Sequence, residues 1–313
     1  MTKPVAKVLS VYELMEMFPN EQSAIDYLEG ILWQNGVVCP FCQGKNVKAR
    51  ISKPNFYHCN ACKGDFSVRV GTIFERSHIP LHKWLFAMYL IVTSRKGISS
   101  LQLSKEIGVT YKSAWFLSQR IRAACGNQLD KLLSGIVEVD ETYLGGLEKN
   151  KHKDKKLNQG RGTVGKTPVL GMRDRDGQVI AQVTESTDAT TLQGEIKKNL
   201  TLGSTVCTDE HRSYVGLDAN EEFVHKTVKH SAKQFVDGMA HTNSIESVWA
   251  VLKRGFMGIF HSFSKKHTQL YVDEFVFRLN EGNCRFDTVN RIEALVRGMA
   301  GKRLTYKMLV HGI

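Results

Sequence analysis

Three acidic residues fall on segments that can bring them together. Asp140 is expected to end a strand in GIVEVDETYLGG, Asp209 ends a second strand in GSTVCTDEHRSY, and Glu246 lies on a helix in HTNSIESVWAVLKRG. Carboxylates from three elements suit a site that holds two Mg²⁺ or Mn²⁺ ions for phosphoryl transfer. Taken singly, an acid at a strand end is more often a cap or turn residue, so the joint order of the three carries the prediction.

The helix that carries Glu246 has an unusual polar face. Asn243, Glu246 and Lys253 are spaced by three and seven residues, which places them on one side of an α-helix together with Ala250. A core-facing side would not carry two charges and an amide without partners. We therefore expect this side to face the metal site and the opposite stripe to pack on the sheet, namely Ile245, Val248, Trp249 and Leu252.

Two CxxC pairs precede this region, CPFC at 39–42 and CNAC at 59–62. Each pair offers two thiolates, and two pairs complete the tetrahedral coordination of a structural zinc ion. Disulfides or a redox pair are the alternatives, and the odd total of seven cysteines argues against a disulfide scaffold. His58 is a fifth ligand candidate, although a surface role suits it better. The predicted zinc ligands are Cys39, Cys42, Cys59 and Cys62.

Positive charge is concentrated between residues 37 and 134, which hold fifteen Lys and Arg against four Asp and Glu. The same stretch contains ISSLQLSKEIGVT, a turn with Gly108, and a second helix at 110–124, an order typical of a helix-turn-helix. Three basic residues lie mostly off the apolar side of that second helix and are predicted to contact DNA: Lys112, Arg120 and Arg122. A solubilising surface and a purely structural three-helix packing remain the alternatives.

The remaining pattern indicates a mixed α/β fold. TPVLGMR and QVIAQVT flank the hairpin turn DRDG, and a helix precedes the strand that ends at Asp209. The lysine-rich stretch 149–166 is either a solvated loop or a phosphate contact. The apolar run WLFAMYLIV is about half the length that a bilayer requires, and no signal peptide is evident, so we expect a soluble, cytoplasmic protein without membrane contact.

Most of the chain resembles the DDE insertion-sequence transposases that have an N-terminal zinc ribbon and a ribonuclease H-like catalytic core. The resemblance is carried by CPFC and CNAC, GTIFERSHIPLHKW, SRKGISSLQLSKEIGVT, and most specifically VEVDETYLGG, VCTDEHRSY and HTNSIESVWAVLKRGFMGIFH. It implies that Asp140, Asp209 and Glu246 form the catalytic triad and that Lys253 contacts DNA. Asn243 either shares the role of Glu246 or binds substrate, and Arg254 belongs to a basic, aromatic segment suited to DNA contact.

The resemblance implies a domain order and a function. The order is an N-terminal helical segment (1–36), a zinc ribbon (37–75), a helix-turn-helix domain (76–134) and a ribonuclease H-like catalytic domain with a helical C-terminus (135–313). The expected function is metal-dependent cleavage and joining of double-stranded DNA at terminal inverted repeats and target sites, by a homo-oligomer on DNA. A nuclease or resolvase with the same core, and a zinc-ribbon regulator with an inactive core, are the alternatives.

Overall fold

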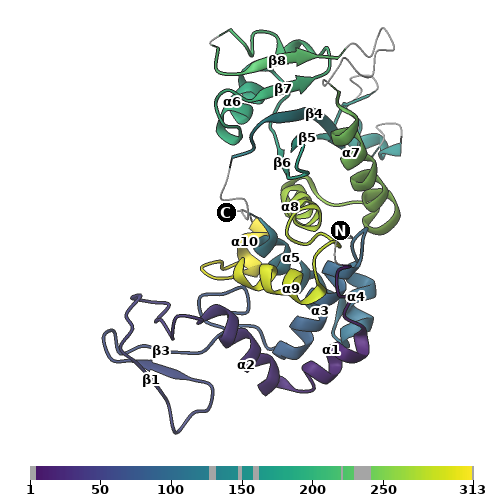
Figure 1. Cartoon of the computed structure of the whole chain (residues 1–313). Coiled ribbons are helices and arrows are strands. Elements are labelled where there is room, and N and C mark those ends of the chain that lie inside the picture. The colour runs from purple at the N-terminus through teal and green to yellow at the C-terminus, as the bar shows by residue number, and fades with distance from the viewer. Residues whose placement is uncertain are drawn as a thin grey trace. The chain divides into compact units, whose positions relative to one another are not determined.

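The computed structural model describes residues 5–126, 132–146, 150–157, 162–219, 221–228 and 241–311. The chain forms two compact units (Figure 1). The first unit consists of Met1–Gln128 together with Glu281–Ile313, and the second consists of Leu129–Asn280. The structure therefore differs from the predicted division at the C-terminal end, because the segment from Glu281 onward packs with the N-terminal unit and not with the sheet.

A small three-stranded antiparallel sheet carries the cysteine pairs in the first unit. Its strands are β1 (Val47–Ala49), β2 (Tyr57–Cys59) and β3 (Asp65–Phe66), with β2 in the middle. Strands this short bury little apolar surface, and the apolar contacts here come mainly from Trp33, Tyr57 and Phe66, whose rings contact one another. Such a sheet needs another source of stability, which the cysteines supply.

Helices make up the rest of the first unit, and several begin at a residue whose side chain caps them. Asn20 accepts from the backbone N–H of Ser23, and Ser99 and Thr110 likewise cap the helices that begin at Ser100 and Tyr111. Gly108 ends one of these helices in the left-handed conformation (φ 62°), a conformation that costs glycine little. The helices are α1 (Val11–Met17), α2 (Glu21–Leu32), α3 (Leu81–Thr93), α4 (Ser100–Ile107), α5 (Tyr111–Cys125), α9 (Thr288–Arg297) and α10 (Tyr306–His311).

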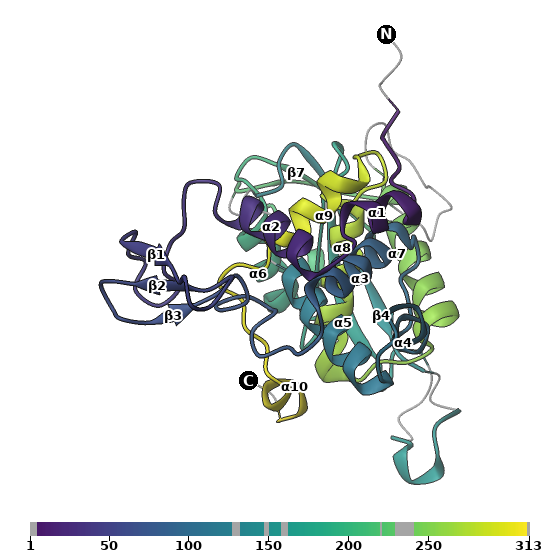
Figure 2. The ribbon, with the colours of Figure 1, turned by 90° about the horizontal axis from the view of Figure 1, so that it is seen from below.

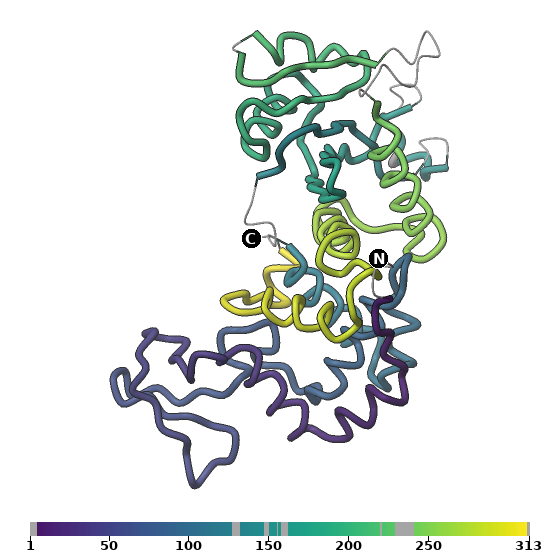
Figure 3. Tube along the Cα trace, in the orientation of Figure 1, coloured from purple at the N-terminus to yellow at the C-terminus, as the bar shows by residue number. Residues whose placement is uncertain are grey.

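Helix α9 lies among helices that precede it by some two hundred residues, as Figure 2 shows for α2 and α3. Its buried Arg291 donates to the carbonyl oxygen of Val92 at 2.8 Å, near the end of α3. The turn that follows α9 reaches α5, where Lys302 Nζ donates to the carbonyl oxygen of Ala123 at 2.9 Å. In Figure 3 the yellow C-terminal trace runs beside the blue trace of the N-terminal helices, although the two segments are far apart in the sequence.

The second unit is built on a five-stranded mixed sheet in the order β6-β5-β4-β7-β8. Strands β4, β5 and β6 are antiparallel neighbours, whereas β7 and β8 run parallel to β4. The predicted hairpin joins β5 to β6, with Asp174 accepting from Gln178 across the turn. The strands are β4 (Ile136–Leu144), β5 (Thr167–Asp174), β6 (Val179–Val183), β7 (Thr205–Thr208) and β8 (Val224–Thr227).

Helices cover both faces of this sheet, which gives the mixed α/β class predicted from the sequence. On one face α6 (Ala189–Asn199) buries Leu192 and Ile196 against Val137 and Val139 of β4. On the other face α7 (Asn243–Gly255) and α8 (Thr268–Leu279) pack over β4, β5 and β6. A π-helical turn (Phe256–Phe260) follows α7. Short 3-10 turns connect other elements, and these are Lys153–Lys155, Arg212–Tyr214 and Lys265–His267.

Helix length and polarity bear on the membrane question. Within the described ranges, no helix is both long enough and apolar enough to cross a bilayer.

Candidate functional site

The parallel pairing of β4 with β7 brings two of the predicted acids side by side. The last paired residues are Glu138 and Cys207, and two residues further along the same register lie Asp140 and Asp209. Alternate residues of a strand share a face, so Asp140 is on the face of β4 that α7 covers, and Asp209, directly after β7, is near enough for its charge to act on Asp140. β4 continues to Leu144, so Asp140 lies within the strand and not at its end as predicted, because its pairing with β5 extends past it.

Asp140 is held in surroundings that disfavour its charge. Burial raises the pKa of Asp140 from 3.8 to about 7, with the charges of Glu141 and Asp209 acting in the same direction. The indole N–H of Trp249 opposes this rise, although it lies outside full hydrogen-bonding geometry. Close to neutral pH, Asp140 is therefore poised between the protonated and the ionised form.

The indole of Trp249 reaches the sheet because its neighbour there is a glycine. Gly171 of β5 pairs with Asp140, and a Cβ atom added to Gly171 would lie 2.3 Å from the Trp249 ring. No side chain fits in that space. The glycine therefore lets α7 lie close to the sheet beside Asp140.

Helix α7 presents the face that its sequence predicts. Asn243, Glu246 and Lys253 are exposed, as is Ala250 between them. The opposite stripe is buried in the core between α7 and the sheet, as predicted for Ile245, Val248, Trp249 and Leu252. Glu246 Oε1 accepts from the hydroxyl of Thr242 at 3.2 Å, one turn earlier.

The three acids are not gathered as tightly as metal ligands are. In the described part of the chain, the carboxylate oxygens of Asp140, Asp209 and Glu246 do not all lie within 4.8 Å of one another. Asp209 Oδ1 accepts from the backbone N–H of His211 at 2.9 Å, so this acid also shapes its own turn. Asp140 is on the sheet face that α7 covers, whereas Glu246 is on the exposed side of α7, so these described acids do not close into a ligand shell.

Of the two acids that neighbour Asp140 and Asp209, Glu141 behaves as strand alternation predicts. Glu141 points to the opposite face, where its carboxylate accepts from the hydroxyl of Tyr214 at 2.6 Å. Burial and the charge of Glu141 raise the pKa of Tyr214 well above 10, so the hydroxyl stays a donor. Glu210, next to Asp209, is exposed. Glu141 thus does not share the face of Asp140.

Sequence reasoning gave no role to Glu138, two residues before Asp140 on the same face. Its carboxylate is buried and contacts Arg175, His241 and the first turn of α7. The one signal in the sequence was the alternation of β4, which put Glu138 on the Asp140 face. Its partners come from distant segments and could not be identified that way.

The basic residues predicted on α5 divide into two groups. Lys112 is exposed at the start of the helix, with its ammonium 4.9 Å from the centre of the Tyr306 ring. Arg120 and Arg122 are 4% and 1% exposed, so the prediction that they contact DNA is wrong. The guanidinium of Arg120 donates to the carbonyl oxygens of Leu304 and Glu75. The C-terminal segment covers the side of α5 that local periodicity left open.

The segment after Glu246 keeps its basic residues at the surface. Lys253 and Arg254 are exposed on the last turn of α7, where cations also suit the helix dipole. The aromatic rings that follow contact one another, with the rings of Phe263 and Tyr271 stacked at 4.3 Å. The lysine-rich stretch 149–166 lies partly outside the described residues, and its phosphate contact stays a prediction.

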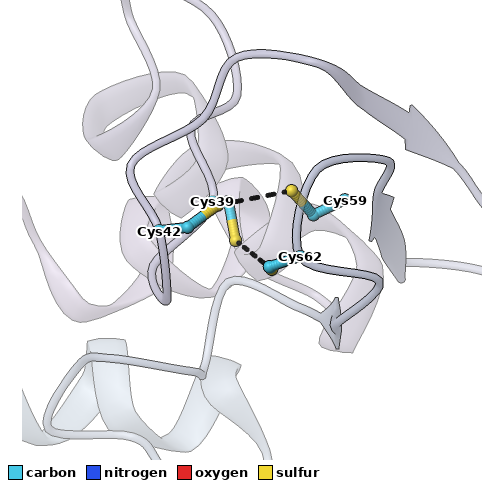
Figure 4. A group of neighbouring side chains, drawn as sticks. All are labelled: Cys39, Cys42, Cys59 and Cys62. Carbon is cyan, nitrogen blue, oxygen red and sulfur yellow. Dashed lines mark hydrogen bonds between the residues drawn. The ribbon is translucent and has the colours of Figure 1, made fainter.

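The four predicted zinc ligands lie together, as Figure 4 shows. Their sulfur atoms all fall within 4.8 Å of one another, with Cys39 and Cys62 Sγ 3.6 Å apart and Cys42 and Cys59 Sγ also 3.6 Å apart. All four are free thiols, which is inconsistent with the disulfide alternative. Four sulfurs at 2.3 Å from a tetrahedral zinc ion would be about 3.8 Å apart. The cluster fits a structural zinc ion.

Two backbone turns of the same geometry build this cluster. Cys39 N–H donates to Gly44 and Gln43 N–H donates to Cys39, and the same pattern recurs from Cys59 to Gly64. Backbone N–H groups of Cys62 and Ala61 lower the pKa of the Cys59 thiol to about 6, with burial opposing them. This turn favours the thiolate of Cys59. In the other turn the backbone N–H of Gly44 lowers the pKa of Cys42, but neighbouring thiols outweigh it and the pKa rises to about 12.

His58 is not part of this cluster. Its Nδ1 lies 2.7 Å from a carboxylate oxygen of Asp65 on the neighbouring strand β3. The ring is therefore a strand partner and not a fifth ligand.

Comparison with known proteins places both sites in one family. Residues 132–280 match the ISXO2-like transposase domain, and residues 19–64 match the transposase zinc-ribbon domain. An uncharacterized protein in the transposable element ISH50 of Halobacterium salinarum is 33% identical over 84% of this chain and 92% of its own length. An uncharacterized transposase-like protein of Haemophilus influenzae is 30% identical over 39% of this chain and 95% of its own length.

A solved structure of a pre-cleavage Mos1 transpososome aligns with 70% of this chain and 79% of its own chain at 12% identity. Its TM-score is 0.21, so it carries no argument about the fold.

A mixed α/β unit joined to a four-cysteine zinc ribbon defines a transposase of the zinc-ribbon type. Within that class, the chain belongs to the ISXO2-like transposase family.

Proposed function

We propose that this chain is a DDE transposase that binds the terminal inverted repeats of its insertion sequence and cuts and joins DNA strands. In this proposal Asp140, Asp209 and Glu246 are the catalytic acids. The observation that supports it is the pairing of β4 with β7, whose register leads to Asp140 on β4 and to Asp209 directly after β7, near enough for the charge of Asp209 to act on Asp140. The sheet order, three antiparallel strands followed by two strands parallel to the first, supports a ribonuclease H-like core.

The acids suit divalent cations. All the donors are carboxylate oxygens, which Mg²⁺ and Mn²⁺ prefer, and the pKa of Asp140 is raised by burial and by neighbouring negative charges that a cation would offset. When bound, such ions polarise a phosphodiester and lower the pKa of an attacking water or 3′-hydroxyl. Asp140 would have to lose its proton to bind them, whereas Glu246 faces solvent, and we assign contact with either metal or substrate to the exposed Asn243, one turn before it.

DNA contact is assigned to the exposed basic residues of both units. Lys253 and Arg254 end the helix that carries Glu246, so they are placed to hold the phosphates that flank a scissile bond. Lys112 lies at the start of α5, and the N-terminal part of the second helix of a helix-turn-helix is the part that meets base edges. Terminal repeats and target DNA are the proposed partners, and two DNA ends would be held by a homo-oligomer.

The test uses purified protein, Mg²⁺ or Mn²⁺, and short duplexes with the sequence that flanks the gene. Wild type is compared with Asp209→Asn and with Glu210→Gln, a matched control that neutralises the neighbouring exposed acid. Strand cleavage and joining are followed on denaturing gels. We expect metal-dependent cleavage and joining that Asp209→Asn abolishes and Glu210→Gln retains.

The other outcomes separate the alternatives. Cleavage without joining would indicate a nuclease or resolvase. Tight binding with neither reaction would indicate a regulator with an inactive core, and equal loss in both variants would remove Asp209 from the proposed site.

A further inference from the structure

Glu138 is a buried acid that the proposed chemistry does not use. It lies on β4 two residues before Asp140, and only 1% of it is exposed. A carboxylate at such depth is costly unless hydrogen bonds and an opposite charge compensate it. Its partners therefore indicate what the acid is for.

One oxygen of Glu138 holds the first turn of α7. Oε2 accepts from the backbone N–H of Ser244 at 2.8 Å and from that of Ile245 at 3.0 Å. These N–H groups have no partner within a helix, and they form its positive end. Thr242, which precedes the helix, makes no side-chain cap hydrogen bond, so Glu138 supplies the cap from the sheet.

The other oxygen of Glu138 is held by two basic side chains. Arg175 forms an ion pair with Oε1, and His241 Nδ1 lies 3.2 Å from the same oxygen. Arg175 also contacts the His241 ring, 2.7 Å from Nε2. Arg173 of β5 adds a further link by donating to the carbonyl oxygen of Ser244 at 3.0 Å. The helix start is thus fixed through both its N–H and its C=O groups.

We propose that Glu138 is a positioning residue that clamps the start of α7 to β4 and so sets Glu246 relative to Asp140. The inference deepens the proposed function and rests on it. The clamp joins two short backbone segments: Ser244 and Ile245 directly precede Glu246, and Glu138 lies two residues from Asp140. The acids lack a closed ligand shell of their own, so their relative position depends on how α7 is anchored. A shift of about 1 Å in such a site can cost about 100-fold in rate.

The test compares Glu138→Gln with Glu274→Gln. Glutamine keeps the shape of Glu138 but cannot accept from both the α7 amides and Arg175. Glu274 is a matched control, since it is equally buried and paired with Arg278, but it lies on α8. For each variant, hydrogen–deuterium exchange of residues 243–255, duplex affinity, and cleavage over a series of Mn²⁺ concentrations are measured well below the unfolding temperature.

We expect Glu138→Gln to speed exchange at the start of α7, slow cleavage by about 10- to 100-fold and raise the Mn²⁺ concentration at half-maximal rate. Duplex affinity should stay within about twofold of wild type, because the exposed basic residues are unchanged. Glu274→Gln should match wild type in exchange of α7 and in cleavage.

The proposal that Glu138 anchors α7 would be overturned if Glu138→Gln changed neither the exchange of α7 nor cleavage. It would also be overturned if Glu274→Gln speeded exchange of α7 and slowed cleavage to the same extent. A different outcome is that wild type does not cleave while exchange in α7 is faster in Glu138→Gln. That result would overturn the proposed function and the positioning of Glu246, but it would still support the anchoring of α7 by Glu138. Glu138→Asp is a second variant: its shorter side chain keeps the charge but cannot span both partners, so it should also slow cleavage.

Discussion

The zinc-ribbon cluster and the proposed acidic site of this protein are built in opposite ways. In the zinc ribbon, four sulfur atoms lie within 4.8 Å of one another, and backbone N–H groups lower the pKa of Cys59 to about 6. In the second unit, the three acids are spread over β4, the end of β7 and α7, and burial with like charge raises the pKa of Asp140 to about 7. The ribbon lowers the pKa of Cys59 while the pKa values of Cys42 and Cys62 rise, whereas the proposed acidic site disfavours the charge of Asp140.

The difference follows from what each site has to do. Each cysteine pair lies within one short turn, so local backbone geometry alone brings its two ligands together. The acids come from separate elements, and their spacing depends on packing such as that of Trp249 over Gly171. A structural zinc ion takes all four ligands from the protein, while ions that take part in chemistry need substrate oxygens among their ligands. An open set of acids is consistent with that second use.

The largest expected effect is on the ribbon. Cys59→Ser removes a buried ligand and should abolish zinc binding and unfold the ribbon, since structural zinc contributes about 10–16 kcal/mol in small domains. Zinc content by mass spectrometry and duplex binding would both fall, and Cys284→Ser, at an exposed cysteine outside the cluster, should change neither. Full zinc content in Cys59→Ser would show that Cys59 is not a zinc ligand, and the contrast between the ribbon and the acidic site would then fail.

The second prediction concerns the charge of Asp140. Its folded pKa of about 7 exceeds the ordinary 3.8, so the folded protein binds the extra proton between these values and loses stability as pH rises through them. Without added Mg²⁺ or Mn²⁺, Asp140→Asn should therefore be more stable than wild type above pH 7, by at most about 4 kcal/mol. The gain should shrink as pH falls toward 4, as thermal unfolding at several pH values would show.

Asp188 provides a control of opposite sign. It caps α6, and hydrogen bonds from Ser186 and Thr191 lower its pKa to about 2. Asp188→Asn should lose stability at neutral pH, and that loss should fade as pH falls from 4 through 2. If the stability of both variants relative to wild type changed with pH in the same direction, the raised pKa of Asp140 and the lowered pKa of Asp188 would be contradicted.

The third prediction tests the close approach of α7 to the sheet. Gly171→Ala should displace the Trp249 ring, cost about 1–3 kcal/mol or more, and slow cleavage because Asp140 lies opposite. Gly194→Ala is the control, since its added Cβ meets nothing within 4 Å in helix α6. It should stabilise by about 0.5–1 kcal/mol. Equal unfolding midpoints for the two variants would show that the glycine is not needed there.

The smallest effects are expected at exposed lysines, and they separate the two units. Lys112→Ala should weaken binding to the element ends, and Lys253→Ala should weaken binding near the cleavage point. If each lysine contacts a phosphate, its loss should reduce the slope of log affinity against log salt by about 1 without altering unfolding. Footprinting on an end duplex would locate each loss, and a common footprint for both variants would argue against the division.

Much of the fold follows from local sequence signals. The turn at Gly108 and the DRDG hairpin lie where the sequence predicts them. The cysteine cluster was predicted in full because its ligands come from two short turns. The exposed face of α7 was also predicted, because helical periodicity is a property of the segment itself.

Other features depend on partners that lie far along the chain. Arg120 reads as surface from the periodicity of α5, yet Leu304 and Glu75 accept its hydrogen bonds. Glu138 takes its role from Arg175, His241 and the start of α7, which no local pattern links to it. Such long-range pairings are set by tertiary packing, which overrides the local pattern.

The packing of Lys302 against the end of α5 has a consequence for how the protein is made. A ribosome completes α5 long before it adds Lys302, whose ammonium binds the carbonyl oxygen of Ala123. Until that late segment emerges, the helices of the first unit lack part of their cover, while the sheet unit between them is already synthesised and can fold. The N-terminal unit, although synthesised first, is thus the one whose folding must wait for the end of translation.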